Sequence, residues 1–370
     1  MSNLIDRGTF VMGTGSRDAA LDRNVILKLE RKILGGRCVE EQIDRLNRWQ
    51  LASSPLLMKE KGEILLRRGR LLEAQKVLAD ALRGLADGAM QQAMLSAMAL
   101  LAMVYLRTGQ PGAASTLLKF LQDEAAGQGF EPCSGHVEWA LALGGHLIGA
   151  TPEAAAEYYA AAADKFADSG DWRRTSLVLA DHLFRQYFAA AREDWFAALH
   201  RLDHAAAFDP EARRLGRLIR AFDAFMAGRR TEAAALLNEA GEDAPLTGIW
   251  SRISAELARQ LQLFRGIDGN PDLDSGYPAM NSPDLEAESL AELTRYLQVV
   301  LTDNREEARL SESRQNSMEQ LGLHPVFRSI ARKLRELAAE AGAASRTEAD
   351  TATGATISGQ TEAGIPAGVD

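Results

Sequence analysis

The sequence predicts an all-α protein, an α-α superhelix built as a solenoid of antiparallel helix pairs. Ala and Leu dominate the composition while β-branched residues are sparse, which favours helix over strand. Apolar residues recur at the helical spacing i, i+4, i+7. A turn glycine followed five residues later by an alanine recurs with a period of about 40 residues, and periods between about 20 and 50 residues are typical of solenoids.

Composition and charge limit the classes of function. The 370-residue chain is 46% hydrophobic and 25% charged, as is usual for a soluble protein with a sizeable core. Its net charge of -9 argues against direct nucleic-acid binding, because phosphate contacts require a basic surface. Cys38 and Cys133 stand far apart and form no CxxC pattern, so we expect neither a disulfide framework nor a zinc module. The first residues have no signal-peptide core and no apolar run is long enough to span a membrane, so we predict a cytoplasmic protein without a membrane partner.

The N-terminal segments precede the repeats. Residues 1–20 are rich in glycine and are predicted to be a loose lead. The following array of helices is predicted over residues 21–265. Its first amphipathic helix covers residues 20–34 and stops at Gly35-Gly36, because a glycine pair is a plausible helix C-terminus. A second short helix is predicted over residues 39–51.

The repeat is defined by a turn glycine and an anchor alanine. The pairs are Gly69 with Ala74, Gly109 with Ala114, Gly149 with Ala154, and Gly228 with Ala233. A degenerate copy is placed around Ala198, where Glu193 replaces the glycine. The successive anchors are 40, 40, 44 and 35 residues apart. We therefore expect about five helical hairpins with a period that is not strict.

Side chains around each anchor support this alignment. Four residues after the anchor stands a large side chain, and three residues further on stands Ala or Leu. These two rows are Leu78, Leu118, Tyr158, Leu202 and Leu237, then Ala81, Leu121, Ala161, Ala205 and Ala240. Twelve residues before the anchor stand Gly62, Ala102, Ala142 and Ala221, which permit close crossing of the paired helices. Pro111 and Pro152 fall near helix starts, where a missing N–H costs nothing.

This pattern resembles the tetratricopeptide repeat over roughly residues 50–265. The spacing near 40 residues is closer to the longer helical repeats of large ATP-dependent bacterial transcription activators of the MalT type. Those activators carry a nucleotide-binding domain before the repeats and a helix-turn-helix or similar domain after them, and this chain shows neither pattern. The resemblance therefore implies a tetratricopeptide-like solenoid that corresponds to the repeat region alone.

The C-terminal third changes in character. Residues 266–284 are rich in Gly, Pro, Asp and Asn and are predicted to be a linker or long loop. Two C-terminal helices are expected within residues 285–341, over 285–301 and 318–341. Residues 342–370 contain few large apolar side chains and are predicted to be a disordered tail.

The candidate binding surface is the concave face of the superhelix, because the first helix of each pair normally lines that face. Nine residues map to it from the anchors. They are Lys59, Glu63, Arg67, Met103, Arg107, His136, Trp139, His146 and Tyr187. The hypothesis is a groove with charge at one end and aromatic side chains in the middle. The alternative is that these are ordinary surface or packing positions.

A metal site is the second alternative. His200 and His204 are an i, i+4 pair beside Asp203, and Asp181-His182 on the preceding helix is the possible source of a third ligand. Such a pair outside an HExxH motif is more often exposed or packed, so we predict no metal and no other cofactor. The sequence has no G-x-S-x-G elbow and no dinucleotide fingerprint, so we predict no catalytic residues.

The leading hypothesis is a non-enzymatic scaffold that binds a protein or peptide partner on its concave face. Charged side chains would orient the ligand and aromatic side chains would bury its anchors. The first alternative is a signalling or sensor module related to the repeat region of a transcriptional regulator. The second alternative is a metal-dependent protein that uses His182, His200 and His204.

Overall fold

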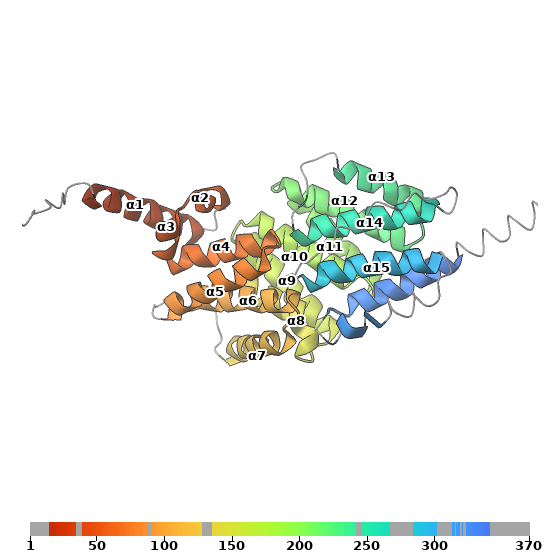
Figure 1. Ribbon diagram of the computed structural model, residues 1–370, viewed down its shortest axis with the longest axis horizontal. Coiled ribbons are helices and arrows are strands. Elements are labelled where there is room, and N and C mark those ends of the chain that lie inside the picture. The colour runs from red at the N-terminus through yellow and green to blue at the C-terminus, as the bar shows by residue number, and fades with distance from the viewer. Residues whose placement is uncertain are drawn as a thin grey trace, which may run out of the picture. The chain divides into compact units, whose positions relative to one another are not determined.

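The structure is a computed structural model that describes residues 15–34, 39–86, 90–127, 135–241, 246, 248–266, 284–301, 313–314, 316–318, 320 and 323–340. All regular elements in these ranges are helices, and no strand occurs among them (Figure 1). The all-α prediction is confirmed. The chain divides into two compact units. Unit 1 comprises Met1–Tyr105 and Gly112–Leu179, and unit 2 comprises Leu106–Pro111 and Ala180–Asp370.

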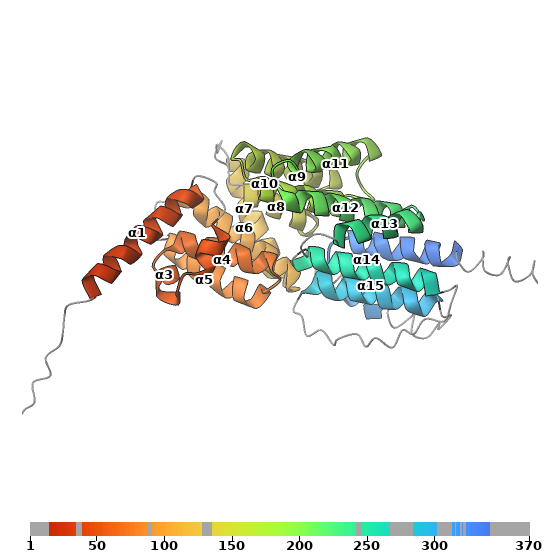
Figure 2. The ribbon, with the colours of Figure 1, turned by 90° about the horizontal axis from the view of Figure 1, so that it is seen from above.

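Unit 1 is built from short N-terminal helices followed by helical hairpins. Its helices are α1 (Gly15–Leu34), α2 (Glu40–Asp44), α3 (Arg48–Ala52), α4 (Pro55–Arg67), α5 (Leu71–Ala86), most of α6 (Gln91–Arg107), α7 (Pro111–Gly127), α8 (Gly135–Gly144), the 3-10 turn η1 (Gly145–Leu147), α9 (Pro152–Asp168) and the first part of α10 (Trp172–Arg185). The consecutive helices α4 and α5 pack against each other, and so do α8 and α9 (Figure 2). Proline begins α7 and α9, as expected from its preference for the first helical turn.

The first helices of unit 1 share one hydrophobic cluster. Its buried members are Leu29, Val39, Ile43, Leu57 and Ile64, and Ile26, Ile33, Leu46 and Leu51 pack against them. Helix α1 begins at Gly15, so its first turns include the end of the segment predicted as a loose lead. Residues 16–20 contain neither Gly nor Pro, and nothing in their composition opposes a helix.

The predicted hairpin turns are present. Gly69, Gly109, Gly149 and Gly228 adopt φ angles of 75°, 67°, 80° and 77°. This left-handed conformation is strained for a residue with a Cβ atom, which explains the repeated glycine. After Gly69, the N–H of Arg70 donates to the carbonyl of Leu65 at 2.9 Å and so closes the helix end. The same backbone bond recurs after Gly149 and Gly228, so the three turns share one helix-capping geometry.

The third hairpin corrects the predicted register by one residue. Its turn is longer, because Thr151 caps α9 through its hydroxyl and the helix begins only at Pro152. The buried stripe is consequently Ala155, Tyr159 and Ala162, whereas the predicted Ala154, Tyr158 and Ala161 are half-buried.

The structure also defines where the second helix of the degenerate repeat, around Ala198, begins. Helix α11 (Arg192–Ala205) begins at Arg192, and its fourth residue is Trp195, which is 1% exposed. The predicted anchor, Ala198, is buried as well, one turn further along. The fourth residues of the second helices are Ala74, Ala114, Ala155, Trp195 and Ala233. Their spacings are 40, 41, 40 and 38 residues, more regular than those of the alignment from sequence.

Unit 2 contains the end of α10 and α11, short helical stretches at residues 313–314, 316–318 and 320, and further helices of more than ten residues. These are α12 (Pro210–Met226), α13 (Arg230–Gly241), α14 (Gly248–Gly266), α15 (Leu285–Leu301) and a helix over residues 326–340. Consecutive helices pack as the pairs α12 with α13 and α14 with α15. Phe184 lies in the core of this unit, with ring centroids 5.1 Å from Phe222, 6.2 Å from Trp250 and 6.0 Å from Phe327.

The C-terminal helices agree in part with the prediction. Helix α15 has the predicted bounds. Within the predicted helix over 318–341, residues 318 and 320 are helical, residues 323–325 interrupt the helix, and it runs over residues 326–340 after Pro325. Residues 1–14 of the predicted lead, nearly all of the predicted linker 266–284 and the predicted tail 342–370 lie outside the described residues. In the described part of the chain, no helix has both the length and the hydropathy required to cross a bilayer.

Candidate functional site

Four of the nine predicted surface residues lie close together in unit 1. Lys59, Glu63 and Arg67 come from α4, and His136 comes from the first turn of α8. Lys59, Glu63 and His136 are buried, and Arg67 is half-buried. We call Lys59, Glu60, Glu63, His136, Asp171 and Arg174 the buried ion-pair cluster. Its members come from α4, from α8, from the residue before α10 and from the first turn of α10, and Asp171 and Arg174 are its half-buried members.

Arg174 is the centre of this cluster. Its Nε donates to Glu63 Oε1 at 2.7 Å, and its Nη2 donates to Glu63 Oε2 at 2.6 Å. The same guanidinium reaches Glu60 at 2.8 Å and Asp171 at 2.5 Å. The imidazole Nε2 of His136 lies 3.1 Å from Glu63 Oε2, and Lys59 pairs with Glu60. This bidentate arrangement is the strong form of a carboxylate–guanidinium pair.

The cluster shifts the pKa values of its members. Burial by itself would raise the pKa of Glu63, but Arg174 and His136 outweigh burial and hold that pKa well below its usual range. Burial would likewise lower the pKa of Arg174, and Glu63, Glu60 and Asp171 outweigh it. Burial lowers the pKa of His136 in spite of its carboxylate neighbour, so the imidazole is neutral near pH 7.

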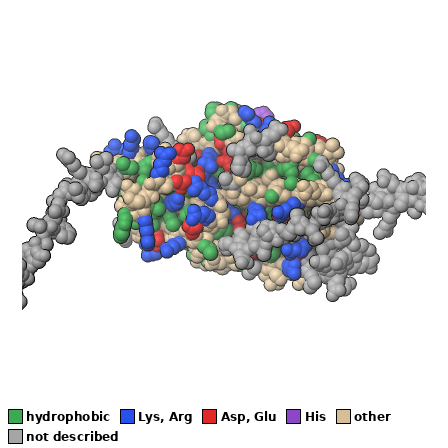
Figure 3. Space-filling model, turned by 45° about the horizontal axis from the view of Figure 1, so that its top comes forward, with side chains coloured by type: hydrophobic (Ala, Val, Ile, Leu, Met, Phe, Trp, Pro, Cys, Tyr) green, Lys and Arg blue, Asp and Glu red, His purple; other side chains and the backbone are tan. Residues whose placement is uncertain are grey.

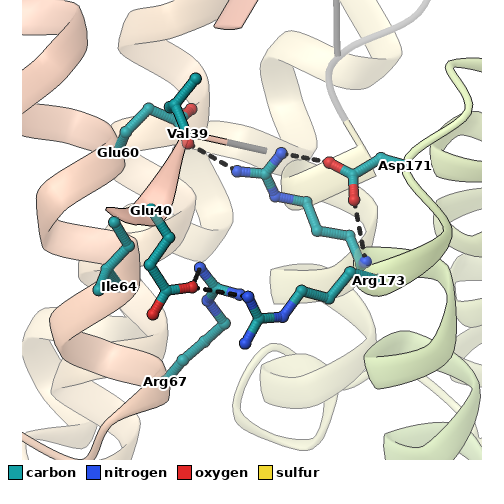
Figure 4. A pocket seen from close by; sticks show the side chains of 8 residues that line it. Val39, Glu40, Glu60, Ile64, Arg67, Asp171 and Arg173 are labelled. Atoms are coloured by element: carbon teal, nitrogen blue, oxygen red, sulfur yellow. Dashed lines mark hydrogen bonds and ion pairs between the residues drawn. The ribbon is translucent and has the colours of Figure 1, made fainter. Parts of the chain in front are cut away.

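A small pocket lies beside the cluster (Figure 4). Glu40 Oε2 accepts hydrogen bonds there from Arg67 at 3.1 Å and from Arg173 at 2.7 Å. The cavity volume is about 30 Å³, which is room for one or two water molecules. Pockets that hold drug-sized ligands are at least about ten times larger. This pocket is therefore too small for such a ligand, and the carboxylate and guanidinium groups that line it form ion pairs with one another.

The remaining predicted residues lie in other environments. Met103 and Trp139 are buried, and the ring of Trp139 stands edge-on to Phe166 with centroids 6.4 Å apart. Arg107 is buried in unit 2, where it pairs with Asp284. His146 and Tyr187 are half-buried.

Histidine and carboxylate side chains do not assemble a metal centre in the described ranges, where no group of three or more His, Cys, Asp or Glu is arranged to hold a metal ion. His182, His200 and His204 therefore do not form the cluster considered from the sequence. Burial lowers the pKa of His182 to about 4, which keeps this imidazole neutral. His200 and His204 are exposed on α11.

Tyr187 belongs to a second group of side chains, in unit 2. We call Tyr187, Phe188, Arg192 and Phe196 the aromatic–arginine surface. They lie in the turn after α10 and on the first turns of α11, above the buried Trp195. Phe188 is 41% exposed and Phe196 is 51% exposed.

Ring and cation contacts hold this surface in place. The Tyr187 ring lies 4.9 Å from Phe188 and 5.8 Å from Trp195, edge to face in both cases. The guanidinium of Arg192 lies 5.5 Å from the Tyr187 centroid, 4.5 Å from that of Trp195 and 4.7 Å from that of Phe196. Such cation–π contacts fix a long side chain that would otherwise be mobile.

Two hydrogen bonds to the protein interior position the rings of Tyr187 and Trp195. The Tyr187 hydroxyl donates to Asp223 Oδ1 at 2.9 Å, and the indole N–H of Trp195 donates to the carbonyl of Leu183 at 2.8 Å. Asp223 also accepts hydrogen bonds from Arg192 and Arg229. Burial and Asp223 raise the pKa of Tyr187, so its hydroxyl remains protonated and continues to donate.

The fold and these sites define an all-helical protein of consecutively packed helix pairs with internally paired charges and an exposed aromatic surface. Comparisons with protein-family models, with curated proteins and with solved structures find no match.

The sequence contained a signal for part of the missed surface. The core stripe of α11 is Trp195, Leu199 and Leu202, and Phe196 lies off that stripe. A large aromatic residue off the stripe is expected to face outward. The partners of Glu63 gave no comparable signal, because Arg174 is 111 residues away in the chain.

Proposed function

We propose that this chain is a tetratricopeptide-like α-α superhelix that acts as a non-enzymatic scaffold and binds a protein or peptide partner. The observation that carries the proposal is the aromatic–arginine surface, where Phe188 and Phe196 are exposed beside a fixed guanidinium. Aromatic and arginine side chains dominate the binding energy of protein interfaces. Complete burial of a phenylalanine side chain contributes about 1.5–3 kcal/mol, and these two rings are already about half covered, so each would contribute roughly half of that.

Pre-organisation supports the same conclusion. The rings and Arg192 are held by edge-to-face contacts, by cation–π contacts and by Asp223 before any partner arrives. Ordering rotamer-rich side chains on binding costs about 0.5–1.5 kcal/mol each, and most of that cost is already met in the free protein.

The proposal assigns binding to Tyr187 and its neighbours rather than to all nine predicted residues. Glu63, Arg67, Arg107 and His136 already have partners within the chain. Breaking those partners to reach a ligand would leave buried charges uncompensated, which costs several kcal/mol.

A second candidate is a sensor or signalling module related to the repeat region of a transcriptional regulator. The helix-aligned spacings of 40, 41, 40 and 38 residues support it, because they match the longer helical repeats better than the standard one. A screen of small metabolites by thermal shift tests this candidate. A saturable rise in melting temperature favours sensing, and no response to any compound counts against it.

Site-specific photo-crosslinking tests the scaffold proposal. A photoreactive phenylalanine analogue replaces Phe196 in the full chain, which is expressed in the organism it comes from. We expect a discrete crosslinked protein that disappears when Phe188→Ala is added. The control places the analogue at Leu72, which is 62% exposed on α5. Identical adducts at both positions, or adducts unaffected by Phe188→Ala, would refute the proposal.

A further inference from the structure

The most exposed large hydrophobic side chain in the described residues is Trp49, at 84%. The backbone that carries it is capped, because α3 begins with a capping box in which Asn47 and Gln50 exchange hydrogen bonds of 2.9 Å. Leu51 anchors the other side of α3 in the hydrophobic cluster of unit 1. A tryptophan exposed to water on an ordered helix is typical of the side chains that anchor protein interfaces.

Basic side chains are exposed on the helices that neighbour this tryptophan in the sequence. Arg48 precedes it, and Arg45, at the end of α2, has a side chain that is 81% exposed. Helix α1 packs into the same cluster as α3 and turns Arg23, Lys28 and Arg31 to the surface. Val25 and Leu27 are exposed between them, at 42% and 41%. Lys and Arg side chains gather over this N-terminal part of unit 1 in the space-filling view (Figure 3). We call these residues with Trp49 the basic tryptophan surface.

The distribution of charge makes this surface unusual for the chain. Residues 1–86 contain 16 Lys and Arg against 11 Asp and Glu, a net charge of +5. The whole chain is -9, so residues 87–370 carry -14. The positive surface therefore belongs to a strongly acidic protein. Residues 87–370 of a second copy would attract this surface electrostatically.

The aromatic–arginine surface has chemistry that complements the basic tryptophan surface. Glu193 and Asp194 are exposed on the first turn of α11 beside Phe196, and neither forms an ion pair within the described residues. Arg192 is the cation of that surface, and it pairs with Asp223, which also pairs with Arg229. The surface thus offers two exposed phenylalanine rings next to two exposed carboxylates. The basic tryptophan surface offers one indole next to the exposed guanidinium groups of Arg45 and Arg48, and Arg45 has only a long, solvent-exposed ion pair with Glu41 at 3.9 Å.

We propose that the basic tryptophan surface of one copy docks on the aromatic–arginine surface of a second copy, so that the chain associates head to tail. Trp49 would pack against Phe188 and Phe196, and Arg45 and Arg48 would pair with Glu193 and Asp194. The two surfaces are different, so the contact is heterologous and closes into a ring or continues as an open chain. The inference rests on the proposed function, because it names the partner of the aromatic–arginine surface.

An anionic membrane is the less favoured occupant of the basic tryptophan surface. The apolar face of α1, with Ile26, Leu29 and Ile33, already packs in the core and is not free to enter lipid. Only Trp49, Val25 and Leu27 remain, and a phospholipid surface would repel the acidic remainder of the chain.

Reciprocal charge reversal in the full chain tests the proposal by analytical ultracentrifugation at low ionic strength. We expect the wild type to form larger species as concentration rises and to dissociate with added salt. Arg45→Glu/Arg48→Glu and Glu193→Arg/Asp194→Arg should each weaken self-association at least about tenfold. An equimolar mixture of the two variants should associate again, because each reversed surface then meets its complement. This rescue excludes misfolding as the cause of the loss.

Trp49→Ala should weaken association in the same way, whereas Leu72→Ala should not, since Leu72 is exposed on α5 outside both surfaces. A wild type that stays monomeric up to about 1 mM, or variants whose mixture does not associate, overturns the proposal. Monomeric protein that still yields a Phe188-dependent adduct from position 196 would leave the proposed scaffold function standing. Binding of the monomer to phosphatidylserine vesicles would instead assign the basic tryptophan surface to a membrane.

Discussion

Removing Arg174 should destabilise the protein far more than removing an exposed arginine. Arg174→Met takes away the guanidinium that binds both oxygens of Glu63 and one oxygen of Glu60 at 2.6–2.8 Å. Glu63 is 1% exposed, so water cannot replace the lost guanidinium, and its remaining partner is the imidazole of His136, which is neutral near pH 7. Glu60 is 7% exposed and retains its pair with Lys59. Breaking a buried ion pair from one side costs about 3–5 kcal/mol.

Urea denaturation of the full chain measures this loss, and a thermal scan should show a melting temperature lower by about 10 °C. Arg70→Met is the matched control. Arg70 pairs with Glu73 at 2.6 Å in the same unit, but the two side chains are 53% and 56% exposed. That variant should lose less than about 1 kcal/mol.

A double variant distinguishes the loss of the ion pair from the loss of side-chain volume. If Glu63→Gln is added to Arg174→Met, the combined loss should fall short of the sum by more than about 1 kcal/mol, because the two groups interact directly. Arg174→Met that is no less stable than Arg70→Met would refute the reasoning, since the cluster would then behave as exposed charge.

The remaining predictions concern pH and backbone packing. The pKa of Glu63 in the folded state lies well below its ordinary value of 4.5, so the stabilisation that it provides is complete above about pH 4.5 and is lost as pH falls. In Glu63→Gln, the free energy of unfolding should therefore fall less steeply as the solution is acidified. An unchanged dependence on acidic pH would contradict this. Gly62→Ala would place a Cβ atom 2.5 Å from Leu78 Cγ and should cost about 1–3 kcal/mol in urea denaturation. Gly112→Ala meets nothing within 4 Å and is the control, expected to be neutral or stabilising by up to about 1 kcal/mol. Gly149→Ala also has open space but φ is +80°, so we expect a loss of about 1–2 kcal/mol from backbone strain alone, and an unchanged melting temperature would argue against the turn geometry.

Much of the helical organisation was predictable because its signals are local. The period of apolar side chains and the glycine at each turn depend on residues a few positions apart, and the structure confirms the turns at Gly69, Gly109, Gly149 and Gly228. The bounds of α15 were predicted for the same reason. The register of the third hairpin was wrong, because one additional turn residue moves the whole stripe and the neighbouring Ala and Tyr residues fit either register.

The candidate sites were predicted less well. Lys59, Glu63 and His136 were assigned to a groove because charged residues are usually exposed. In the structure they are buried by partners from other helices, above all by Arg174. Tyr187 was the one predicted residue that lies on the aromatic–arginine surface, and the adjacent Phe188 and Phe196 were not predicted.

The sequence by itself determined that this chain is helical, where its hairpins turn and which stripe of most second helices is buried. These properties arise from backbone sterics and from helical periodicity, which act over one or two turns of chain. Only the tertiary structure decided which charges are paired and which aromatic side chains stay exposed. Arg174 meets Glu63 across 111 residues and Arg107 meets Asp284 across 177 residues, and no local pattern records a contact made over such distances.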